Sequence, residues 1–161
     1  MSIRFATDGD KDAIWAILEP VIRRAETYTL PRDMGREAAL EFWFAPENET
    51  FVWQGDAGVL GTYFLRANQR GGGSHVANCG YVTATAAEGR GIARAMCLHS
   101  LERAKERGFR AMQFNFVVST NTRAVELWKR LGFEVVGRLP DAFRHPELGF
   151  VDAYVMYRAL L

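Results

Sequence analysis

The sequence predicts a mixed α/β fold built as one domain over residues 1–161. Two observations lead to this fold class. A strand, a Gly-rich turn that opens a helix, and a second strand follow one another over residues 75–118, and this order forms a parallel strand pair with a right-handed crossover. Short strands joined by tight turns over residues 50–83 indicate an antiparallel meander. Both features together require a mixed sheet with helices packed against it.

In the first half of the chain, apolar periodicity and turn residues define the elements. Apolar residues recur at helical spacing from Ala13 to Ile22, and Asp8 or Asp10 is expected to cap this helix. Pro31 disfavours helix in the residue before it, which leaves a loop. The expected elements are a strand at 3–6, a helix at 10–24, a loop at 25–34, a helix at 35–44, strands at 50–54 and 58–67, and a flexible turn at 69–74.

In the second half, glycines are expected to end the helices, and alternation marks a strand. Gly108 and Gly132 stand where a residue in the left-handed conformation closes a helix. Residues 111–118 alternate, so one face is expected to carry Met112, Phe114, Phe116 and Val118, and the other Gln113 and Asn115. The expected elements are a strand at 75–83, a helix at 90–107, a strand at 111–118, a helix at 122–131, a strand at 133–139, a loop through Pro140 and Pro146, and a strand at 148–159.

Composition excludes several classes of function. The chain has a net charge of +1 and 48% hydrophobic residues, so its bulk charge does not favour nucleic-acid binding. No apolar stretch reaches the roughly 18 residues of a membrane span, and the first residues lack the apolar run of a secretory signal. The two cysteines and three histidines are scattered, which predicts a reduced, cytoplasmic protein without a metal site.

The Gly-rich turn 88-EGRGIAR-94 is a candidate anion site. A helix N-terminus offers unpaired N–H groups and a partial positive charge, and glycines let the backbone approach a phosphate. A P-loop would need Gly-Lys-Ser/Thr here, and Arg94 stands where a dinucleotide-binding turn has its third small residue. The turn alone therefore leaves two interpretations open, a site for the pyrophosphate of coenzyme A or a turn without a ligand.

A second motif decides between these interpretations. The pattern N-x-x-A-x-x-L-aromatic-x-x-x-G-F occurs at Asn121, Ala124, Leu127, Trp128, Gly132 and Phe133. With the turn at Gly91 and Ala93, it resembles the GNAT superfamily of acyl-CoA N-acyltransferases over essentially the whole chain. The resemblance implies the GNAT fold, a mixed sheet of roughly seven strands with about four helices and a splay between two central parallel strands.

The resemblance also implies where acetyl-CoA binds. The cofactor would lie between the strands at 75–83 and 111–118, with its pantetheine against the backbone and its pyrophosphate at the Gly-rich turn. The cofactor-binding residues implied in this way are Val82, Thr83, Gly89, Arg90, Gly91, Ile92, Ala93, Arg94 and Asn121. Asn121 is also in position to be the N-cap of the following helix.

Three residues depart from the superfamily pattern, and one of them is Thr85, which stands where similar turns often carry proline. Glu88 stands where similar turns carry Gln or Arg, and a carboxylate there would oppose a pyrophosphate unless it points to solvent or is compensated by Arg90 or Arg94. Trp128 stands where many relatives have a tyrosine that protonates the leaving thiolate. An indole is not a general acid at neutral pH, so packing is the simpler role for Trp128.

A closer resemblance concerns the acceptor. The segments 74-SHVANCGY-81 and 113-QFNFVVSTN-121 look like the acetyltransferases of azetidine-2-carboxylate and other proline analogues, which implies Asn78 and Asn115 in substrate binding and Asn115 and Asn121 in catalysis. The loop 26-ETYT-29 resembles the substrate loop of phosphinothricin acetyltransferases. Tyr28 would then form a pocket wall, and Glu26 is either a general base acting through water or a solvated carboxylate.

The sequence therefore predicts acetyl-CoA-dependent N-acetylation of a small-molecule amine, an amino acid or an analogue of one. Direct transfer in a ternary complex is expected, since no Ser/His/Asp arrangement is visible and Cys79 fits simple packing. Two alternatives stay open, acetylation of a protein N-terminus or lysine, and a non-catalytic CoA-binding domain. The aromatic segment 143–157 is either an ordinary core strand or the interface of a homodimer.

Overall fold

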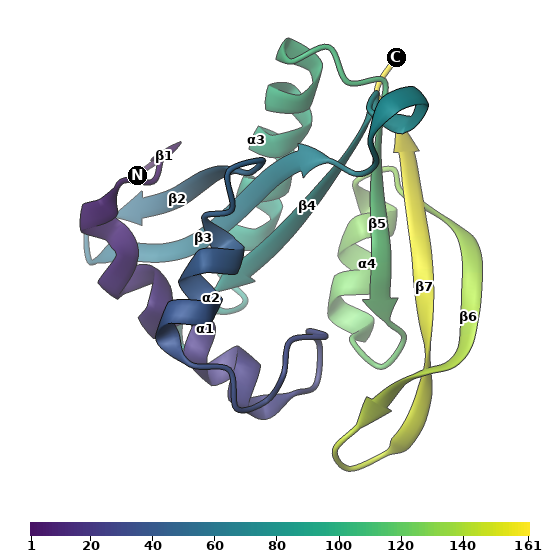
Figure 1. Ribbon diagram of the computed structural model, residues 1–161, viewed down its shortest axis with the longest axis horizontal. Coiled ribbons are helices and arrows are strands. Elements are labelled where there is room, and N and C mark those ends of the chain that lie inside the picture. Colours follow the sequence, from purple (N-terminus) through teal and green to yellow (C-terminus); the bar gives the residue numbers. More distant parts are fainter.

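The computed structural model describes residues 1–161, and Figure 1 shows its arrangement. The chain forms four helices and seven strands, with short 3-10 turns at Asp8–Asp10, Gly71–Gly73 and Thr85–Ala87. The helices and strands are β1 (Ser2–Phe5), α1 (Lys11–Arg24), α2 (Arg36–Trp43), β2 (Glu49–Gly55), β3 (Gly58–Ala67), β4 (Val76–Thr83), α3 (Ile92–Glu106), β5 (Ala111–Val118), α4 (Thr122–Arg130), β6 (Glu134–His145) and β7 (Gly149–Ala159).

All seven strands belong to one mixed sheet in the order β1-β2-β3-β4-β5-β7-β6. Only β4 and β5 run parallel, and every other neighbouring pair is antiparallel. The predicted fold class is confirmed, including the splay, because β4 and β5 pair only at Val76–Ala111 and Ala77–Met112. Beyond these residues the two strands diverge, as the teal and green arrows in Figure 1 show.

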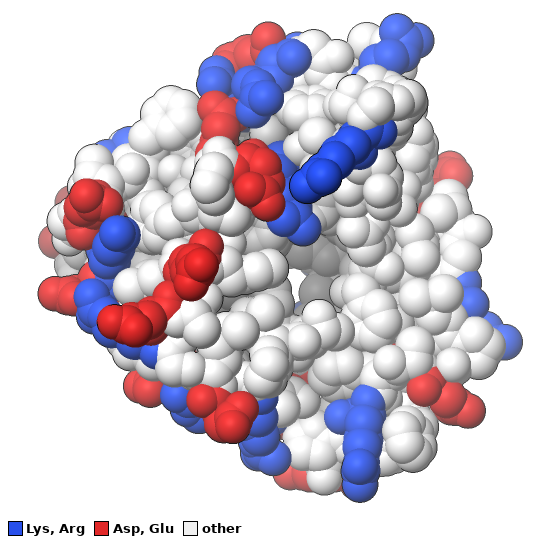
Figure 2. All heavy atoms as spheres, viewed as in Figure 1, with Lys and Arg blue, Asp and Glu red and all other residues white.

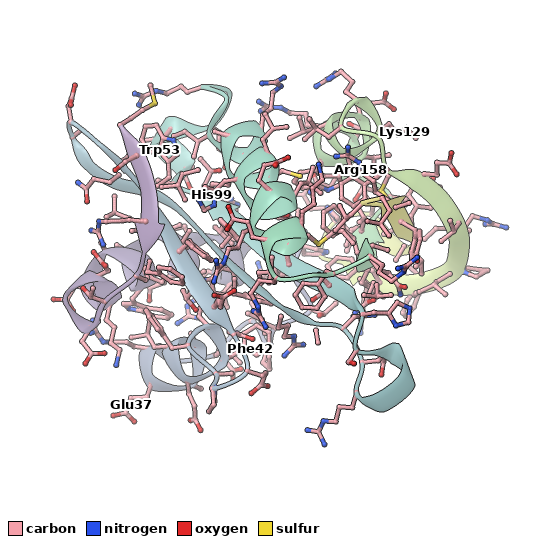
Figure 3. The ribbon with its side chains drawn as sticks, turned by 90° about the horizontal axis from the view of Figure 1, so that it is seen from above. Glu37, Phe42, Trp53, His99, Lys129 and Arg158 are labelled. Carbon is pink, nitrogen blue, oxygen red and sulfur yellow. The ribbon has the colours of Figure 1, made fainter.

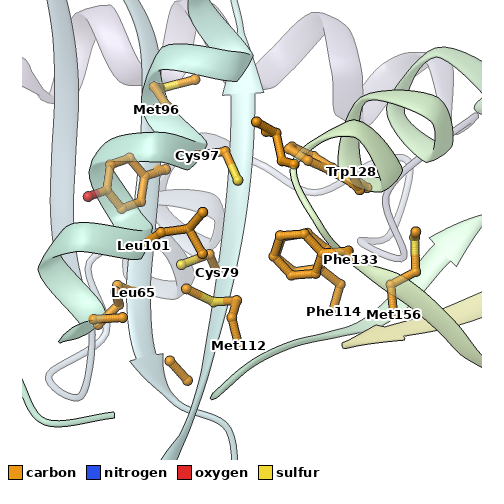
Figure 4. Packing of buried hydrophobic residues seen from close by; sticks show 14 of the residues in the cluster. Leu65, Cys79, Met96, Cys97, Leu101, Met112, Phe114, Trp128, Phe133 and Met156 are labelled. Atoms are coloured by element: carbon orange, nitrogen blue, oxygen red, sulfur yellow. The ribbon is translucent and has the colours of Figure 1, made fainter. Parts of the chain in front are cut away.

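Helices cover both faces of the sheet. Seen from above, Phe42 of α2 lies on one side of the sheet and His99 of α3 on the other (Figure 3). On the first side, α1 and α2 bury a core that includes Ile14, Trp43 and Phe64. On the second side, side chains from α3, α4 and β5 form a larger core, shown in Figure 4. None of the helices is both long enough and apolar enough to cross a bilayer.

Glycines end two helices as the sequence predicts. Gly108 and Gly132 have φ of 83° and 92°, in the left-handed region. The residues that follow them, Phe109 and Phe133, donate their N–H groups back to Ala104 and Trp128 at 3.0 Å. These bonds close the last turns of α3 and α4 and send the chain into β5 and β6.

The start of α1 differs from the prediction that Asp8 or Asp10 caps the helix. Asp10 is buried, and its side chain makes no capping bond to α1. Its carboxylate accepts hydrogen bonds from the Thr7 N–H at 2.8 Å and from Arg4 at 2.8 and 2.9 Å. The Arg4 guanidinium, with the Thr7 N–H, lowers the pKa of Asp10 from 3.8 to about 2 although burial opposes the shift. Asp10 therefore ties β1 to α1.

The loop predicted through Pro140 and Pro146 is wrong in its first part, because β6 continues through Pro140 to His145. β6 is an edge strand, and a proline is tolerated there because its backbone nitrogen is not needed as a donor to a neighbouring strand. The pairing with β7 shifts register between Leu139 and Phe143, and Asp141 in this bulge has φ of 50°. The Asp141 N–H is bound by the Asp152 carboxylate at 3.0 Å, which stabilises the bend.

The alternation predicted along β5 is wrong beyond Phe114. Phe114 pairs with Met156 and Val117 with Tyr154, so β5 contains one residue more than β7 between these pairs. This bulge turns Val117 into the core beside Phe114. Phe116 is released from the core and lies beside the cleft described below.

Candidate active site

The divergence of β4 and β5 opens a cleft of about 1050 Å³ through the middle of the molecule. Figure 2 shows its mouth as a hollow at the centre of one face. Its walls come from both cores, from the loop after α1, from the Gly-rich turn and from α4. The volume is at the upper end of the range of small-molecule sites in proteins, which suits a large, extended ligand.

Asn78 lies at the point where the two strands separate. It is buried, and its Nδ2 donates to the carbonyl oxygen of Gln113 on β5 at 2.9 Å. This bond takes the place of the backbone pairing that ends one residue earlier, at Ala77. The side chain therefore bridges the base of the splay, and its Oδ1 receives no hydrogen bond from the protein.

Side-chain amides near Asn78 are bonded to one another, and among them Asn115 lines the cleft. Gln113 Nε2 donates to Asn115 Oδ1 at 2.9 Å, and Asn115 Nδ2 donates to Asn68 Oδ1 at 2.7 Å. Sequence reasoning missed Asn68 and the amide of Gln113. The spacing of Gln113 and Asn115 placed both on one strand face. Nothing local pointed to Asn68, because it is distant from Asn115 in the sequence and comes near it only when the strands pair in the sheet.

The backbone of β4 presents alternate residues to the cleft. The N–H of Ala84 and the carbonyl of Val76 both bond to β3, so even-numbered residues of β4 direct their peptide groups to β3 and odd-numbered ones to β5. Thr83 and Tyr81 thus have peptide groups on the cleft side. Val82, paired with Thr62, reaches the cleft only with its side chain.

The Gly-rich turn lies at the other end of the cleft. Gly89 and Gly91 have φ of 78° and 81°, which is why α3 starts at Ile92 and not at 90 as predicted. The first helical bond of α3 runs from Ala95 N–H to the Gly91 carbonyl, so the N–H groups of residues 92–94 have no acceptor within the helix. Arg94 lines the cleft, whereas Arg90 borders a separate hollow beside Met1 and Trp53.

Two arginines that sequence reasoning missed stand beside this turn. Arg24, at the end of α1, lies 3.6 Å from the Glu88 carboxylate and donates to Thr85 Oγ1 at 3.2 Å. The cation beside Glu88 therefore comes from α1, and not from Arg90 or Arg94 of the turn as expected. Arg123 of α4 has its Nη2 3.3 Å from the position that a Cβ on Gly89 would occupy. Both contacts join elements far apart in the sequence.

Aromatic side chains form the wall between the two ends of the cleft. Trp128 of α4 is 8% exposed, and its ring centroid lies 5.3 Å from that of Tyr81 and 5.0 Å from that of Phe114. This packing, seen in part in Figure 4, fits the structural role expected of Trp128. Asn121 occupies the N-cap position of α4, where its carbonyl accepts the Val125 N–H and its side chain makes no capping bond.

The loop after α1 contributes residues 26–30 to the wall of the cleft. Tyr28 donates its hydroxyl hydrogen to the carbonyl of Tyr81 at 2.9 Å, and burial raises the pKa of this phenol well above its usual value. Gly80 lies beneath it, because a Cβ there would meet Phe64 at 2.6 Å and the Tyr28 hydroxyl at 3.1 Å. Glu26 lines the same cleft without an ion pair or hydrogen bond to the protein.

Two kinds of chemistry find no support in this site. Burial raises the pKa of the Cys79 thiol well above its usual value, so a thiolate nucleophile is disfavoured. No group of three His, Cys, Asp or Glu side chains lies close enough together to hold a metal ion. The groups that remain are amides, backbone N–H donors, arginines and the Glu26 carboxylate.

Comparison with known proteins agrees with this geometry. The family model that matches residues 15–133 is that of the acetyltransferases. The chain belongs to the acetyltransferase (GNAT) family. N-acetyltransferase aca1 of Schizosaccharomyces pombe is 30% identical in an alignment covering 83% of this chain and 72% of the relative.

Solved structures share the fold of this acetyltransferase. A GCN5-related N-acetyltransferase from Kribbella flavida is 41% identical with a TM-score of 0.94, covering 98% of this chain and 96% of its own. YncA from Salmonella typhimurium, solved with its cofactor acetyl-CoA, is 21% identical with a TM-score of 0.87 over 100% of this chain and 94% of its own. The predicted GNAT family, its enzyme class and its fold are confirmed, and acetyl-CoA is the acyl donor of the family.

Proposed function

We propose that this acetyltransferase moves the acetyl group of acetyl-CoA to the amine of a small molecule, an amino acid or a close analogue, by direct transfer in a ternary complex. One observation supports this proposal above the others. A single cleft joins the free N–H groups of residues 92–94 to an amide-lined pocket under the loop after α1. The first suits a pyrophosphate and the second a small polar acceptor.

The donor end of the cleft fits the predicted coenzyme A contacts. The N–H groups of Ile92, Ala93 and Arg94 would hold the pyrophosphate, with Gly89 and Gly91 permitting its close approach. The free peptide groups of Thr83 would pair with the pantetheine arm, and Val82 and Asn121 would contact it with their side chains. Arg123 is a further cation at this end, and Arg90 would reach the cofactor only by turning out of its own hollow.

The acceptor end supplies groups for the transfer itself. The Tyr81 N–H faces the gap between the strands, where it would polarise the thioester carbonyl. Asn78 Oδ1 and Asn115 would orient the amine, and Glu26 would take its proton through a water. A coenzyme A thiol has a pKa of about 8.5, as a cysteine has, so it leaves without the tyrosine that Trp128 replaces.

A small acceptor is favoured over a protein because the acceptor end is covered. The loop 25–34 packs over this end, and Tyr28 is bonded to β4 beneath it. A peptide would have to extend out of the cleft past these residues. The resemblance of Asn78, Asn115 and Asn121 to the proline-analogue acetyltransferases gives the more specific form of the proposal, a cyclic amino acid as acceptor.

The experiment is a thiol-release assay with acetyl-CoA against free amino acids, azetidine-2-carboxylate, phosphinothricin and one N-terminal peptide, with calorimetric titration of coenzyme A beside it. Turnover of a free amino acid or analogue supports the proposal. If the peptide is acetylated and no free amino acid or analogue is, the proposal is replaced by acetylation of a protein N-terminus. Binding of coenzyme A without turnover of any amine replaces it with the CoA-binding domain.

We also propose that the enzyme is a homodimer through the β6–β7 ribbon. This ribbon carries most of the exposed large apolar side chains in the molecule, namely Val135, Val136, Leu139, Leu148 and Phe150. Sedimentation equilibrium tests the proposal, with Phe150→Ser as the variant expected to favour the monomer. A monomer for the unaltered protein at micromolar concentration would refute it.

A further inference from the structure

The cations that line the cleft are not spread evenly along it. Arg24, Arg94 and Arg123 stand at the Gly-rich turn or touch it, and Arg130 belongs to α4. Arg66, on β3, is the one arginine that the sheet itself contributes to the cleft. Sequence reasoning passed over it, because an arginine near the end of a strand is usually a solvated residue.

Arg66 has no strong partner within the protein. Its closest carboxylate oxygen belongs to Glu47, at 3.6 Å from Nη1, and the Glu47 side chain is 62% exposed. The guanidinium donates no hydrogen bond to the protein, and its Cζ lies 5.6 Å from the centroid of the Phe64 ring. The Phe64 ring thus positions the Arg66 guanidinium, while the N–H groups of the guanidinium stay available to an anion in the cleft.

The register of the sheet places Arg66 next to Asn78. The two residues are directly opposed on β3 and β4, so their side chains project from the same face of the sheet. Phe64 and Val82 on that face pack against the core under α1 and α2, which makes it the acceptor side of the cleft. A cation thus neighbours an amide whose Oδ1 is still free to accept a hydrogen bond.

An α-amino acid matches this pair of groups. It carries its amine and its carboxylate on one carbon, so it reaches two neighbouring side chains at once. The carboxylate would bind the guanidinium in a bidentate pair, and an N–H of the amine would donate to Asn78 Oδ1. The amine would then lie beside Asn78, in the gap between the strands where the Tyr81 N–H is proposed to polarise the thioester carbonyl. Phe42 and Phe64 would contact the amino-acid side chain.

We propose that Arg66 binds the carboxylate of the acceptor, and that the acceptors of this enzyme are therefore amines with a free carboxylate on the neighbouring carbon. This inference rests on the proposed function, because it assigns a substrate class to the same cleft. It disfavours peptides with a free N-terminus, whose neighbouring carbonyl is a neutral amide. It also makes Arg66 a specificity-determining residue for acetyl transfer.

The test compares three acceptors that differ only in this group: azetidine-2-carboxylate, its carboxamide, and azetidine. If another amino acid is the better substrate, its acid, amide and decarboxylated amine replace them. The variants are Arg66→Gln and Arg66→Lys. Arg70→Gln is the matched control, because Arg70 is an exposed arginine of the neighbouring turn that does not line the cleft.

For Arg66→Gln we expect kcat/KM on the acid to fall about tenfold to a hundredfold, as for the loss of a charge-assisted bidentate contact. Arg66→Lys should lose less, since it keeps the charge but not the fork. The carboxamide and azetidine, and the KM for acetyl-CoA, should stay within about twofold. Equal loss on all three acceptors, or no loss on the acid, would overturn the assignment.

Calorimetric titration separates this inference from the proposed function. The coenzyme A complex is titrated with azetidine-2-carboxylate and with azetidine, without any acetyl transfer. If the parent protein binds the acid and the Arg66→Gln variant does not, the carboxylate site is supported. This holds even if no amine is ever acetylated, and the proposed function alone then fails. No binding of the acid, or equal binding by the variant, overturns the carboxylate site whatever the turnover shows.

Discussion

Replacing Asn78 by alanine removes the one side-chain bond that joins β4 to β5 where they separate. The Gln113 carbonyl would lose its donor in a partly buried place. An unpaired buried carbonyl costs about 1–2 kcal/mol, and at about 2–4 °C per kcal/mol for a chain of this size the melting temperature should fall by about 2–8 °C. Thermal unfolding followed by circular dichroism measures this loss.

Two further variants show whether the lost hydrogen bond is the cause. Asn78→Asp keeps the volume but sets a carboxylate against the Gln113 carbonyl, so at neutral pH it should cost at least as much as alanine. Asn68→Ala removes the exposed amide bond to Asn115 and should change stability by less than about 0.5 kcal/mol. If Asn78→Asp melts above Asn78→Ala, or if neither variant melts below the parent, the amide does not bridge the splay.

Three more predictions follow from single contacts. The pKa of Asp10 is lowered from 3.8 to about 2, so its ion pair with Arg4 stabilises the fold above pH 3.8 and is lost as the pH falls through about 2. Asp10→Asn should therefore cost about 2 kcal/mol in urea unfolding at pH 7, and the difference from the parent should shrink as the pH falls through that range. Gly89→Ala adds a Cβ at φ of 78° and 3.3 Å from Arg123, so it should lose about 1–2 kcal/mol of stability and bind coenzyme A at least about fivefold more weakly by calorimetry. Gly108→Ala, equally left-handed but with open space around it and outside the cleft, should lose stability alone; an equal loss of affinity there would show that the effect at Gly89 is not local. Trp128→Phe should cost about 1–2 kcal/mol of packing and leave the pH profile of kcat unchanged, because an indole carries no titrating proton; a shifted profile would contradict the packing role.

Much of the fold is predictable from the sequence because the deciding signals are local. Helix ends at Gly108 and Gly132 need only a residue that accepts positive φ, and the order strand, turn, helix, strand allows one handedness of crossover. The Gly-rich turn is local for the same reason, since its conformation depends on Gly89 and Gly91 themselves. These features could be read without knowing what packs against them.

Other features depend on pairing across the sheet, which no local pattern contains. The bulge in β5 that turns Val117 into the core appears only when β5 is aligned with β7. The strand through Pro140 is tolerated only because β6 is at the sheet edge. Asp10 occupies the N-cap position of α1 but its side chain makes no capping bond, because Arg4, on a neighbouring element, binds the Asp10 carboxylate.

The candidate site divides in the same way. The sequence by itself predicted the turn at residues 88–94 from its glycines, and its resemblance to known acetyltransferases predicted the asparagines at 78, 115 and 121, because these signals lie in short segments. Only the tertiary structure decided that Arg24 balances Glu88, that Arg123 stands over Gly89, and that Arg66 neighbours Asn78. The physical reason is that side-chain neighbours in a site are set by strand register and helix packing, which bring together residues distant in the chain.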